Sequence, residues 1–155
     1  MRGASIHVTL VFIGPTRPDT VPDLAAAARE TAALHQPFQV QLGRAGSFGG
    51  GERPRVAWIG LSEGVEALRR LAAELHPRVF GRSAKPPRPL TPHLTVARRA
   101  EDDLVERIDA TLASAPPVTW TADRLVLYRS HIGIGPPLHE ELAVARLGGP
   151  ATPAE

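Results

Sequence analysis

Two short segments of the sequence repeat the pattern His-x-Thr among apolar and β-branched residues. His7 and Thr9 lie in SIHVTLV, and His93 and Thr95 lie in TPHLTVA, half a chain later. Residues two apart in a β-strand point to the same face, so each histidine shares a face with its threonine. Two imidazoles facing each other can take and give a proton near neutral pH, and threonine hydroxyls can donate to phosphate oxygens. The duplicated pattern therefore favours in-line displacement at phosphorus.

The sequence favours this acid/base role for the histidines over a purely structural or a metal-binding role. Either tripeptide alone is an ordinary strand sequence, but two buried copies would each need hydrogen-bond partners in a core. A metal hydrolase would need a third ligand, and the sequence has no HExxH or clustered His/Asp pattern. We therefore expect neither a metal nor a cofactor. His131 and His139 lie in the Gly/Pro-rich stretch Ser130 to Glu140, which favours a solvated turn at the rim of a cleft.

A cationic stretch surrounds the second motif. No acidic residue occurs between Glu74 and Glu101, whereas the same stretch contains Arg78, Arg82, Lys85, Arg88, Arg98 and Arg99. A locally positive field attracts an anionic substrate, which agrees with chemistry at phosphorus. A solvated loop without a binding role would also carry such charge. The use of arginine for nearly every cation in the chain also fits a bias in genomic base composition.

Composition limits the class of protein. A chain of 155 residues, 43% hydrophobic and 22% charged, with a formal charge of +2, predicts one folded domain. The absence of cysteine excludes disulfides, thiolate nucleophiles and iron–sulfur clusters. No apolar run has the length of a membrane span, and the N-terminus lacks the features of a signal peptide, so we expect a cytoplasmic protein. A P-loop and a Gly-x-Ser-x-Gly elbow are both absent.

The elements that must position the two motifs follow from hydrophobic periodicity and turn signals. Helices are predicted from Asp19 or Thr20 to Leu34, from Gly64 to Val79 and from Glu101 to Leu112. Strands are predicted over Ser5 to Ile13, Phe38 to Leu42, Arg55 to Leu61, His93 to Arg98, Val118 to Tyr128 and Leu138 to Leu147.

Connections complete this prediction. The Gly-rich stretch Gly46 to Arg53 predicts a hairpin connection, and Phe80 to Pro92, with four prolines, predicts a loop into the second motif. Several neighbouring strands are joined too closely for a crossover helix, so an antiparallel α+β fold is favoured over a doubly wound parallel sheet. We expect one domain over residues 1–147 and a flexible tail over residues 148–155.

At these residues the sequence resembles the 2H phosphoesterase superfamily, and more closely the RNA 2′,3′-cyclic phosphodiesterases, also called LigT or 2′-5′ RNA ligases. HVTLVFIG from His7 is similar to the first family motif, and PHLTVAR ending at Arg98 is similar to the second. PRVAWIGL ending at Leu61 resembles the middle strand, and LYRS from Leu127 resembles a segment near the end. The resemblance implies two similar α+β lobes with antiparallel sheets flanking a central cleft, each lobe supplying one His-x-Thr strand.

The resemblance also implies an activity and a role for each matched residue. Family members open a 2′,3′-cyclic phosphate to a 2′-phosphomonoester without metal, and some join RNA ends reversibly through a 2′-5′ linkage. By position, the general acid that protonates the departing 3′ oxygen would be His7, and the general base that activates water would be His93. The remaining matched residues would bind substrate: Thr9 and Thr95 the phosphate oxygens, and Phe12 and Arg98 the two faces of the terminal nucleobase.

One departure from the family pattern concerns the start of the chain. Members usually carry a strand and a helix before the first motif, whereas His7 is almost at the beginning of this sequence. Either the start lies further upstream, or the chain is shortened, or the strand is absent. We expect a monomer. An absent strand would leave a sheet edge open, and in that case a dimer is the alternative.

The partner and the substrate have alternatives as well. We expect RNA with 2′,3′-cyclic phosphate ends, or small cyclic nucleotides, as the partner, and no membrane. A non-catalytic module that binds RNA ends is a second candidate. A 2H phosphodiesterase acting on 2′-5′ oligoadenylate or on an ADP-ribose cyclic phosphate is a third.

Overall fold

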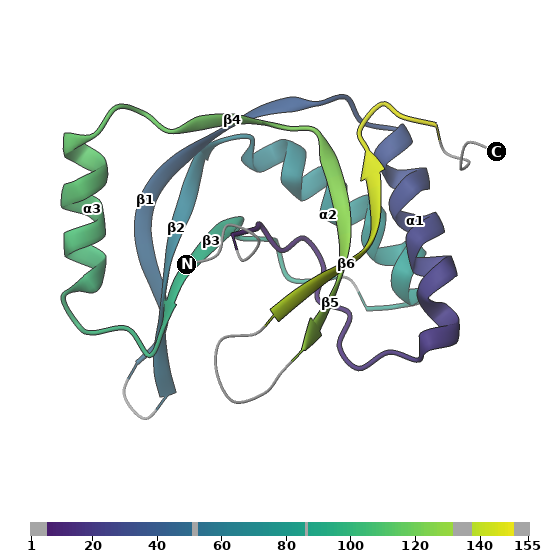
Figure 1. Cartoon of the computed structure of the whole chain (residues 1–155), viewed down its shortest axis with the longest axis horizontal. Helices are drawn as coiled ribbons and strands as arrows, with labels where there is room; N and C mark the ends of the chain where they lie inside the picture. Colours follow the sequence, from purple (N-terminus) through teal and green to yellow (C-terminus); the bar gives the residue numbers. More distant parts are fainter. Residues whose placement is uncertain (1–5, 51–52, 86, 132–137, 151–155) are drawn as a thin grey trace.

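The computed structural model describes residues 6–50, 53–85, 87–131 and 138–150. Within these residues the chain forms helices and two antiparallel sheets, which confirms the predicted α+β class (Figure 1). None of the helices described is both long and apolar enough to span a bilayer. In chain order the elements are η2 (Pro18–Thr20), α1 (Val21–Ala33), β1 (Phe38–Gly50), β2 (Arg53–Glu63), α2 (Val65–Phe80), β3 (His93–Arg98), α3 (Leu104–Ser114), β4 (Thr119–Ala122), β5 (Arg124–His131) and β6 (Leu138–Arg146).

The larger sheet has the strand order β3-β2-β1-β4 and carries the second motif. Strands β1 and β2 form the predicted antiparallel hairpin, and β3 pairs antiparallel with β2 along its whole length. Pro92 is buried where the proline-containing loop enters β3, as expected for a residue that fixes strand entry. Helix α3 lies outside the curl of this sheet, on the side away from β5 and β6 (Figure 1).

The smaller sheet pairs β5 with β6 and packs against helices. Helix α1 is rich in alanine, which lets its backbone approach the strands closely; Ala28 and Ala32 are buried against Leu125, Ala145 and other core residues. Helix α2 turns its apolar face, with the fully buried Leu71, into the same core. The main core of the molecule therefore lies between α1, α2 and the β5–β6 sheet.

The predicted strand over Ser5 to Ile13 is wrong. Over residues 6–13 only Val8 pairs, in a single antiparallel bridge to Leu94 of β3. Two residues later Leu10 packs against the core of α1, α2 and the β5–β6 sheet. The segment leaves β3 after one bridge because its next apolar side chain is buried in the other half of the molecule. It runs between β3 and the β5–β6 sheet (Figure 1).

The predicted single strand over Val118 to Tyr128 is also wrong, because the chain changes sheets at Asp123. Strand β4 pairs with β1, whereas β5 pairs with β6. The Asp123 carbonyl accepts the Leu147 N–H at 2.8 Å, and its carboxylate lies 3.7 Å from Arg146. These contacts fix the position at which the chain passes from one sheet to the other. Alternation of apolar residues cannot reveal this position, because the residues on both sides keep extended backbone.

Two smaller corrections concern boundaries, and one prediction falls partly outside the described residues. The Gly-rich stretch from Gly46 is strand as far as Gly50, because Gly46 pairs directly with Trp58. The third helix begins at Leu104 and ends at Ser114 rather than spanning Glu101 to Leu112. Within the expected tail, residues 151–155 lie outside the described part of the chain.

Candidate active site

The Val8–Leu94 bridge brings the two His-x-Thr motifs together in antiparallel orientation. An antiparallel bridge aligns the residues on either side of it, so His7 lies opposite Thr95 and Thr9 lies opposite His93. These four side chains share one face, and those of Val8 and Leu94 point to the other. Diagonal neighbours in such a pair have Cβ atoms about 7–8 Å apart, which is the relation between the two histidines. The motifs thus form one local arrangement with approximate two-fold symmetry.

The His93 ring is held by the larger sheet. Its Nδ1 lies 2.7 Å from the Thr91 carbonyl oxygen. A carbonyl only accepts, so Nδ1 carries the hydrogen and Nε2 of the neutral ring is left with its lone pair. Phe48 and Trp58 contact the ring with centroid distances of 5.0 and 5.8 Å. His93 is thus fixed in the tautomer that a general base needs at Nε2.

The His7 ring is held by the smaller sheet. It makes an edge contact with His139 of β6 at 4.7 Å and a tilted contact with Tyr128 of β5 at 5.7 Å. The Ser130 hydroxyl and His139 Nδ1 are hydrogen-bonded at 3.1 Å. The Tyr128 hydroxyl donates to Glu141 at 3.3 Å. The two motif histidines therefore contact different sheets, although their backbones are adjacent.

The pKa of Tyr128 is raised, first by burial and then by the nearby Glu141 carboxylate. The phenol therefore stays neutral throughout the neutral pH range and keeps donating its hydrogen bond.

A β-bulge decides where Arg98 points. Trp58 pairs with Thr95 and Ala57 pairs with Ala97, so Val96 is an extra residue in β3. Arg98 lies five positions after His93. Without the bulge this odd offset would turn Arg98 to the opposite face of the sheet. With the bulge, Arg98 pairs with Val56 and joins the face that carries His93 and Thr95.

Phe12 is placed less closely than the other matched residues. It lies four residues beyond the bridge, and 81% of its surface is exposed. Among the described residues, no ring contact joins Phe12 to His7, His93 or Arg98. The structure thus brings His7, Thr9, His93, Thr95 and Arg98 to one face and leaves Phe12 open to solvent.

The cationic stretch remains largely unpaired. Arg78 donates to the Glu74 carbonyl at 2.8 Å and lies 3.7 Å from Glu30. No ion pair with a described carboxylate involves the other five cations, Arg82, Lys85, Arg88, Arg98 and Arg99, which are all exposed. Their positive charge is therefore available to an anionic ligand near β3.

Four side chains around the histidines were not predicted as site residues: Phe48, Trp58, Tyr128 and His139. The prediction that His139 lies in a solvated turn is wrong, since both His131 and His139 are in strands. Ser130 pairs with His139 and Tyr128 pairs with Glu141, so these four residues share one hairpin face. The signal in the sequence was polar residues two positions apart, Tyr128 with Ser130 and His139 with Glu141. Only the pairing register shows that the two pairs share a face.

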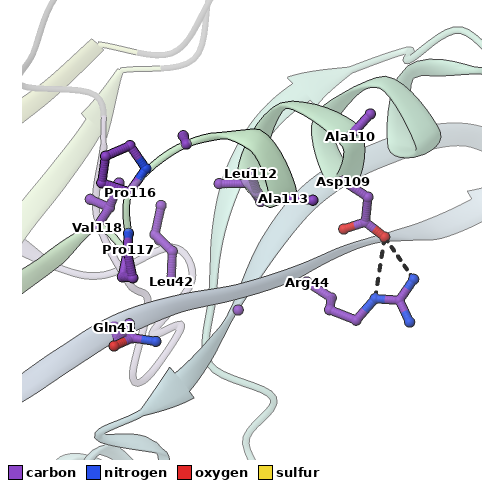
Figure 2. Close-up of a pocket in the computed structure, with 12 residues that line it drawn as sticks. Gln41, Leu42, Arg44, Asp109, Ala110, Leu112, Ala113, Pro116, Pro117 and Val118 are labelled. Atoms are coloured by element: carbon purple, nitrogen blue, oxygen red, sulfur yellow. Dashed lines mark hydrogen bonds and ion pairs between the residues drawn. The ribbon is translucent and has the colours of Figure 1, made fainter.

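A cavity of about 590 Å³ lies elsewhere, on the α3 side of the larger sheet (Figure 2). The Asp109 carboxylate lines it, accepting the Ala45 N–H at 2.7 Å and the Arg44 guanidinium at 2.9 Å. These two hydrogen bonds, the backbone one foremost, hold the pKa of Asp109 below its ordinary value. None of the His-x-Thr residues lines this cavity, so it is separate from the candidate active site.

No group of three or more His, Asp or Glu side chains within the described residues is arranged to hold a metal ion. The described side chains of the site are two imidazoles and two hydroxyls, beside cations that no described carboxylate pairs. Such a set can exchange two protons and bind phosphate oxygens.

Comparisons with known proteins agree with this geometry. The chain is similar to the RNA 2′,3′-cyclic phosphodiesterase of Geobacillus stearothermophilus, 30% identical over 93% of this chain and 46% of that protein. The chain thus spans about half the length of that relative. It is also 28% identical to the RNA 2′,3′-cyclic phosphodiesterase of Methanothermobacter thermautotrophicus, over 92% of this chain and 79% of that protein.

Solved structures resemble the fold. A protein of Thermus thermophilus matches with a TM-score of 0.71 and 28% identity, over 93% of this chain and 79% of that one. Escherichia coli LigT complexed with NADP+ matches with a TM-score of 0.64 and 26% identity, over 93% of this chain and 77% of that one. The family model described as the 2′-5′ RNA ligase superfamily matches residues 2–133. The resemblance carried by the two His-x-Thr motifs is therefore confirmed, and this chain belongs to the 2′-5′ RNA ligase superfamily.

Proposed function

We propose that this protein is a cytoplasmic enzyme that hydrolyses RNA 2′,3′-cyclic phosphate ends to 2′-phosphomonoesters by acid/base catalysis with two histidines. The observation that carries the proposal is the Val8–Leu94 bridge, which aligns two His-x-Thr motifs from distant parts of the chain on one face. The relatives in Geobacillus and Methanothermobacter that bear this activity in their names support the choice of substrate.

In the proposed mechanism His93 is the general base. Its Nδ1–H donates to the Thr91 carbonyl, so Nε2 can take a proton from the attacking water. The water oxygen forms a bond to phosphorus as the bond from phosphorus to the 3′ oxygen breaks. His7, on the far side of the phosphorus, gives a proton to the departing 3′ oxygen, and the phosphate stays on the 2′ oxygen.

The threonines and the free cations bind the anion in this proposal. Thr9 and Thr95 donate hydrogen bonds to the non-bridging phosphate oxygens, where negative charge accumulates in the transition state. Arg98 shares their face and contacts the nucleobase, and Phe12 reaches the base from its exposed segment. The loop with Arg82, Lys85 and Arg88 draws RNA toward the site.

We also propose that residues 1–147 work as a single bilobal domain. Val8 bridges to β3 of the larger sheet, whereas Leu10 packs with the core that contains the smaller sheet. One short segment therefore links both halves of the molecule and carries His7 between them. Separating the halves would move the acid away from the base.

The test is hydrolysis of 2′,3′-cyclic AMP with EDTA present and the products separated by chromatography. We expect formation of 2′-AMP at a rate that EDTA does not change, because the proton transfers need only imidazole side chains. Formation of 3′-AMP, or loss of activity with EDTA, would contradict the mechanism. A protein that binds the nucleotide without converting it would instead be a module that binds RNA ends.

A further inference from the structure

Two aromatic side chains lie beside His93 on the face that carries the candidate active site. Phe48 of β1 and Trp58 of β2 contact each other with a centroid distance of 5.1 Å. Both also contact the His93 ring, at 5.0 and 5.8 Å. Neither residue binds substrate or transfers a proton in the proposed mechanism. Their position beside His93 therefore needs a separate explanation.

The Trp58 ring lies across the sheet because two glycines leave room for it. A Cβ at Gly46, its direct partner on β1, would overlap the ring, and a Cβ at Gly60 would come within 3.3 Å of it. One face of the indole is therefore covered by backbone and the other is turned away from the sheet. Such a flat aromatic surface is suited to stacking with a planar ligand.

The exposure of Phe48 leaves this surface open to a ligand. Phe48 is 43% exposed, although its ring contacts both Trp58 and His93. Every nucleobase has a π-face, so a base of any identity can stack on such rings.

The chemistry of the site determines which nucleotide would carry that base. In ligation, the attacking group is the 5′-hydroxyl of a second RNA end in place of water. His93 takes the proton of that hydroxyl, the bond from phosphorus to the 5′ oxygen forms, the bond to the 3′ oxygen breaks, and His7 protonates the 3′ oxygen. The nucleoside that bears the attacking hydroxyl must therefore approach from the His93 side.

We propose that Phe48 and Trp58 form a stacking platform for the base of the nucleotide that supplies the 5′-hydroxyl in 2′-5′ ligation. This inference rests on the proposed function, because it assigns the base role to His93. Phe48 and Arg98 flank Val56 in the same row of the sheet, two strand spacings or about 10 Å apart. The two nucleobases that flank a 2′-5′ linkage thus have separate contacts, Arg98 for one and the platform for the other.

The experiment compares two reactions of the same protein. One is cleavage of a 2′-5′-linked adenosine dinucleotide to 2′,3′-cyclic AMP and adenosine, which is ligation in reverse, and the other is hydrolysis of 2′,3′-cyclic AMP. Stacking of one base on an aromatic side chain corresponds to about a 5- to 150-fold change in affinity. We expect Phe48→Leu and Trp58→Leu to lower the ratio of dinucleotide cleavage to hydrolysis within that range.

Phe80→Leu is the matched control, because Phe80 is similarly exposed at 42% but lies at the end of α2 and contacts His76. It should leave the ratio of the two rates unchanged. Equal losses of both reactions in Phe48→Leu would overturn the proposal, because the platform would then hold the base of the cyclic nucleotide itself. A wild-type protein that hydrolyses the cyclic nucleotide but neither cleaves nor forms the 2′-5′ linkage would also overturn it.

A binding measurement separates this inference from the proposed function. The chain has two tryptophans, so Trp120→Phe leaves Trp58 as the sole indole fluorophore. Adenosine should quench its fluorescence, and adding Phe48→Leu should weaken the quenching by about 5- to 150-fold in apparent affinity. Quenching in a protein with no hydrolytic activity would contradict the proposed function, and with it the ligation role, but would support an adenosine site on these two rings. Hydrolysis of 2′,3′-cyclic AMP without any quenching at millimolar adenosine would do the reverse.

Discussion

The two motif histidines are each followed by a threonine two residues later, but they contact different kinds of side chain. His93 lies against Phe48 and Trp58, and its Nδ1–H is tied to a backbone carbonyl. His7 lies against His139 and Tyr128, which bring a second imidazole and a hydroxyl. The first environment holds the ring in one tautomer beside two apolar rings, whereas the second places an imidazole and a phenol beside the ring.

A repeated motif can acquire two different surroundings in this way. The two tripeptides share histidine and threonine, and the Val8–Leu94 bridge relates them by approximate two-fold symmetry. The symmetry ends at the rings, because each ring contacts a different sheet. A fixed lone pair suits the role of general base that is proposed for His93. The sheets that contact the rings, and not the motifs themselves, thus make the two histidines different.

The largest expected effect comes from removing either ring. His7→Ala and His93→Ala should each lower kcat for 2′,3′-cyclic AMP by about 10²- to 10⁴-fold, the usual contribution of a general acid or base. Activity is measured by separation of 2′-AMP. His131→Ala is the matched control, because His131 lies on the other face of the hairpin and bonds to Glu140 at 2.9 Å. Full turnover in either motif variant would refute the mechanism.

The next effect tests whether the symmetry extends to the hydroxyls. Thr9→Val and Thr95→Val remove one hydroxyl each with little change of volume. A hydrogen bond to a charged group contributes about 1.5–3 kcal/mol, so each substitution should lower kcat/KM by about 10- to 150-fold, and by similar factors. Thr111→Val is the control, since its hydroxyl donates within helix α3 to the Arg107 carbonyl oxygen. A large effect at one position with none at the other would break the two-fold relation.

A smaller effect should distinguish the two environments by their ring contacts. His139 makes an edge contact with the His7 ring and is hydrogen-bonded to Ser130. An aromatic pair contributes about 0.5–1.5 kcal/mol, so His139→Ala should lower kcat/KM for 2′,3′-cyclic AMP by about 2- to 13-fold, because the His7 ring loses a neighbour that holds it. Unchanged activity in His139→Ala would show that His139 does not position His7.

The smallest effect concerns the sheet that carries His93. Asp109 accepts the Ala45 N–H and the Arg44 guanidinium, and its pKa is lowered first by the backbone bond. A lowered pKa stabilises the fold above the ordinary value of 3.8, and this stability is lost as pH falls through the folded-state pKa. Asp109→Asn keeps an acceptor but loses the charge, and Arg44 is highly exposed. We expect a loss of about 1 kcal/mol or less at pH 7.

Urea unfolding at several pH values checks this expectation. The difference between wild type and Asp109→Asn should shrink as pH falls below 3.8, and should disappear below the lowered pKa of the folded-state carboxyl. Hydrolysis of 2′,3′-cyclic AMP at pH 7 should change less than twofold, because the cavity lined by Asp109 is separate from the histidine face. A difference in stability that persists at lower pH would assign it to packing instead of charge.

Local patterns predicted much of the fold. The Ala-rich α1, the amphipathic α2 and the β1–β2 hairpin follow from propensity, periodicity and turn residues. The errors arose where pairing decides. Alternation over Ser5 to Ile13 predicted which side chains share a face, but a strand also needs a partner, and Leu10 draws that segment into the other core. At Asp123 the chain leaves one sheet for another while its backbone stays extended.

Residue types and their spacing were enough to define the chemistry available to this protein: two His-x-Thr motifs, a cationic approach and no cysteine. Those properties depend on side-chain identity and on the two-residue period of extended chain, which are local. The folded molecule added that His7 contacts His139, that the Val96 bulge brings Arg98 to the face that carries His93, and that the Trp58 indole lies beside the His93 ring. Contacts between distant segments depend on strand register and on where each apolar residue finds its core, and no short window of sequence contains that information.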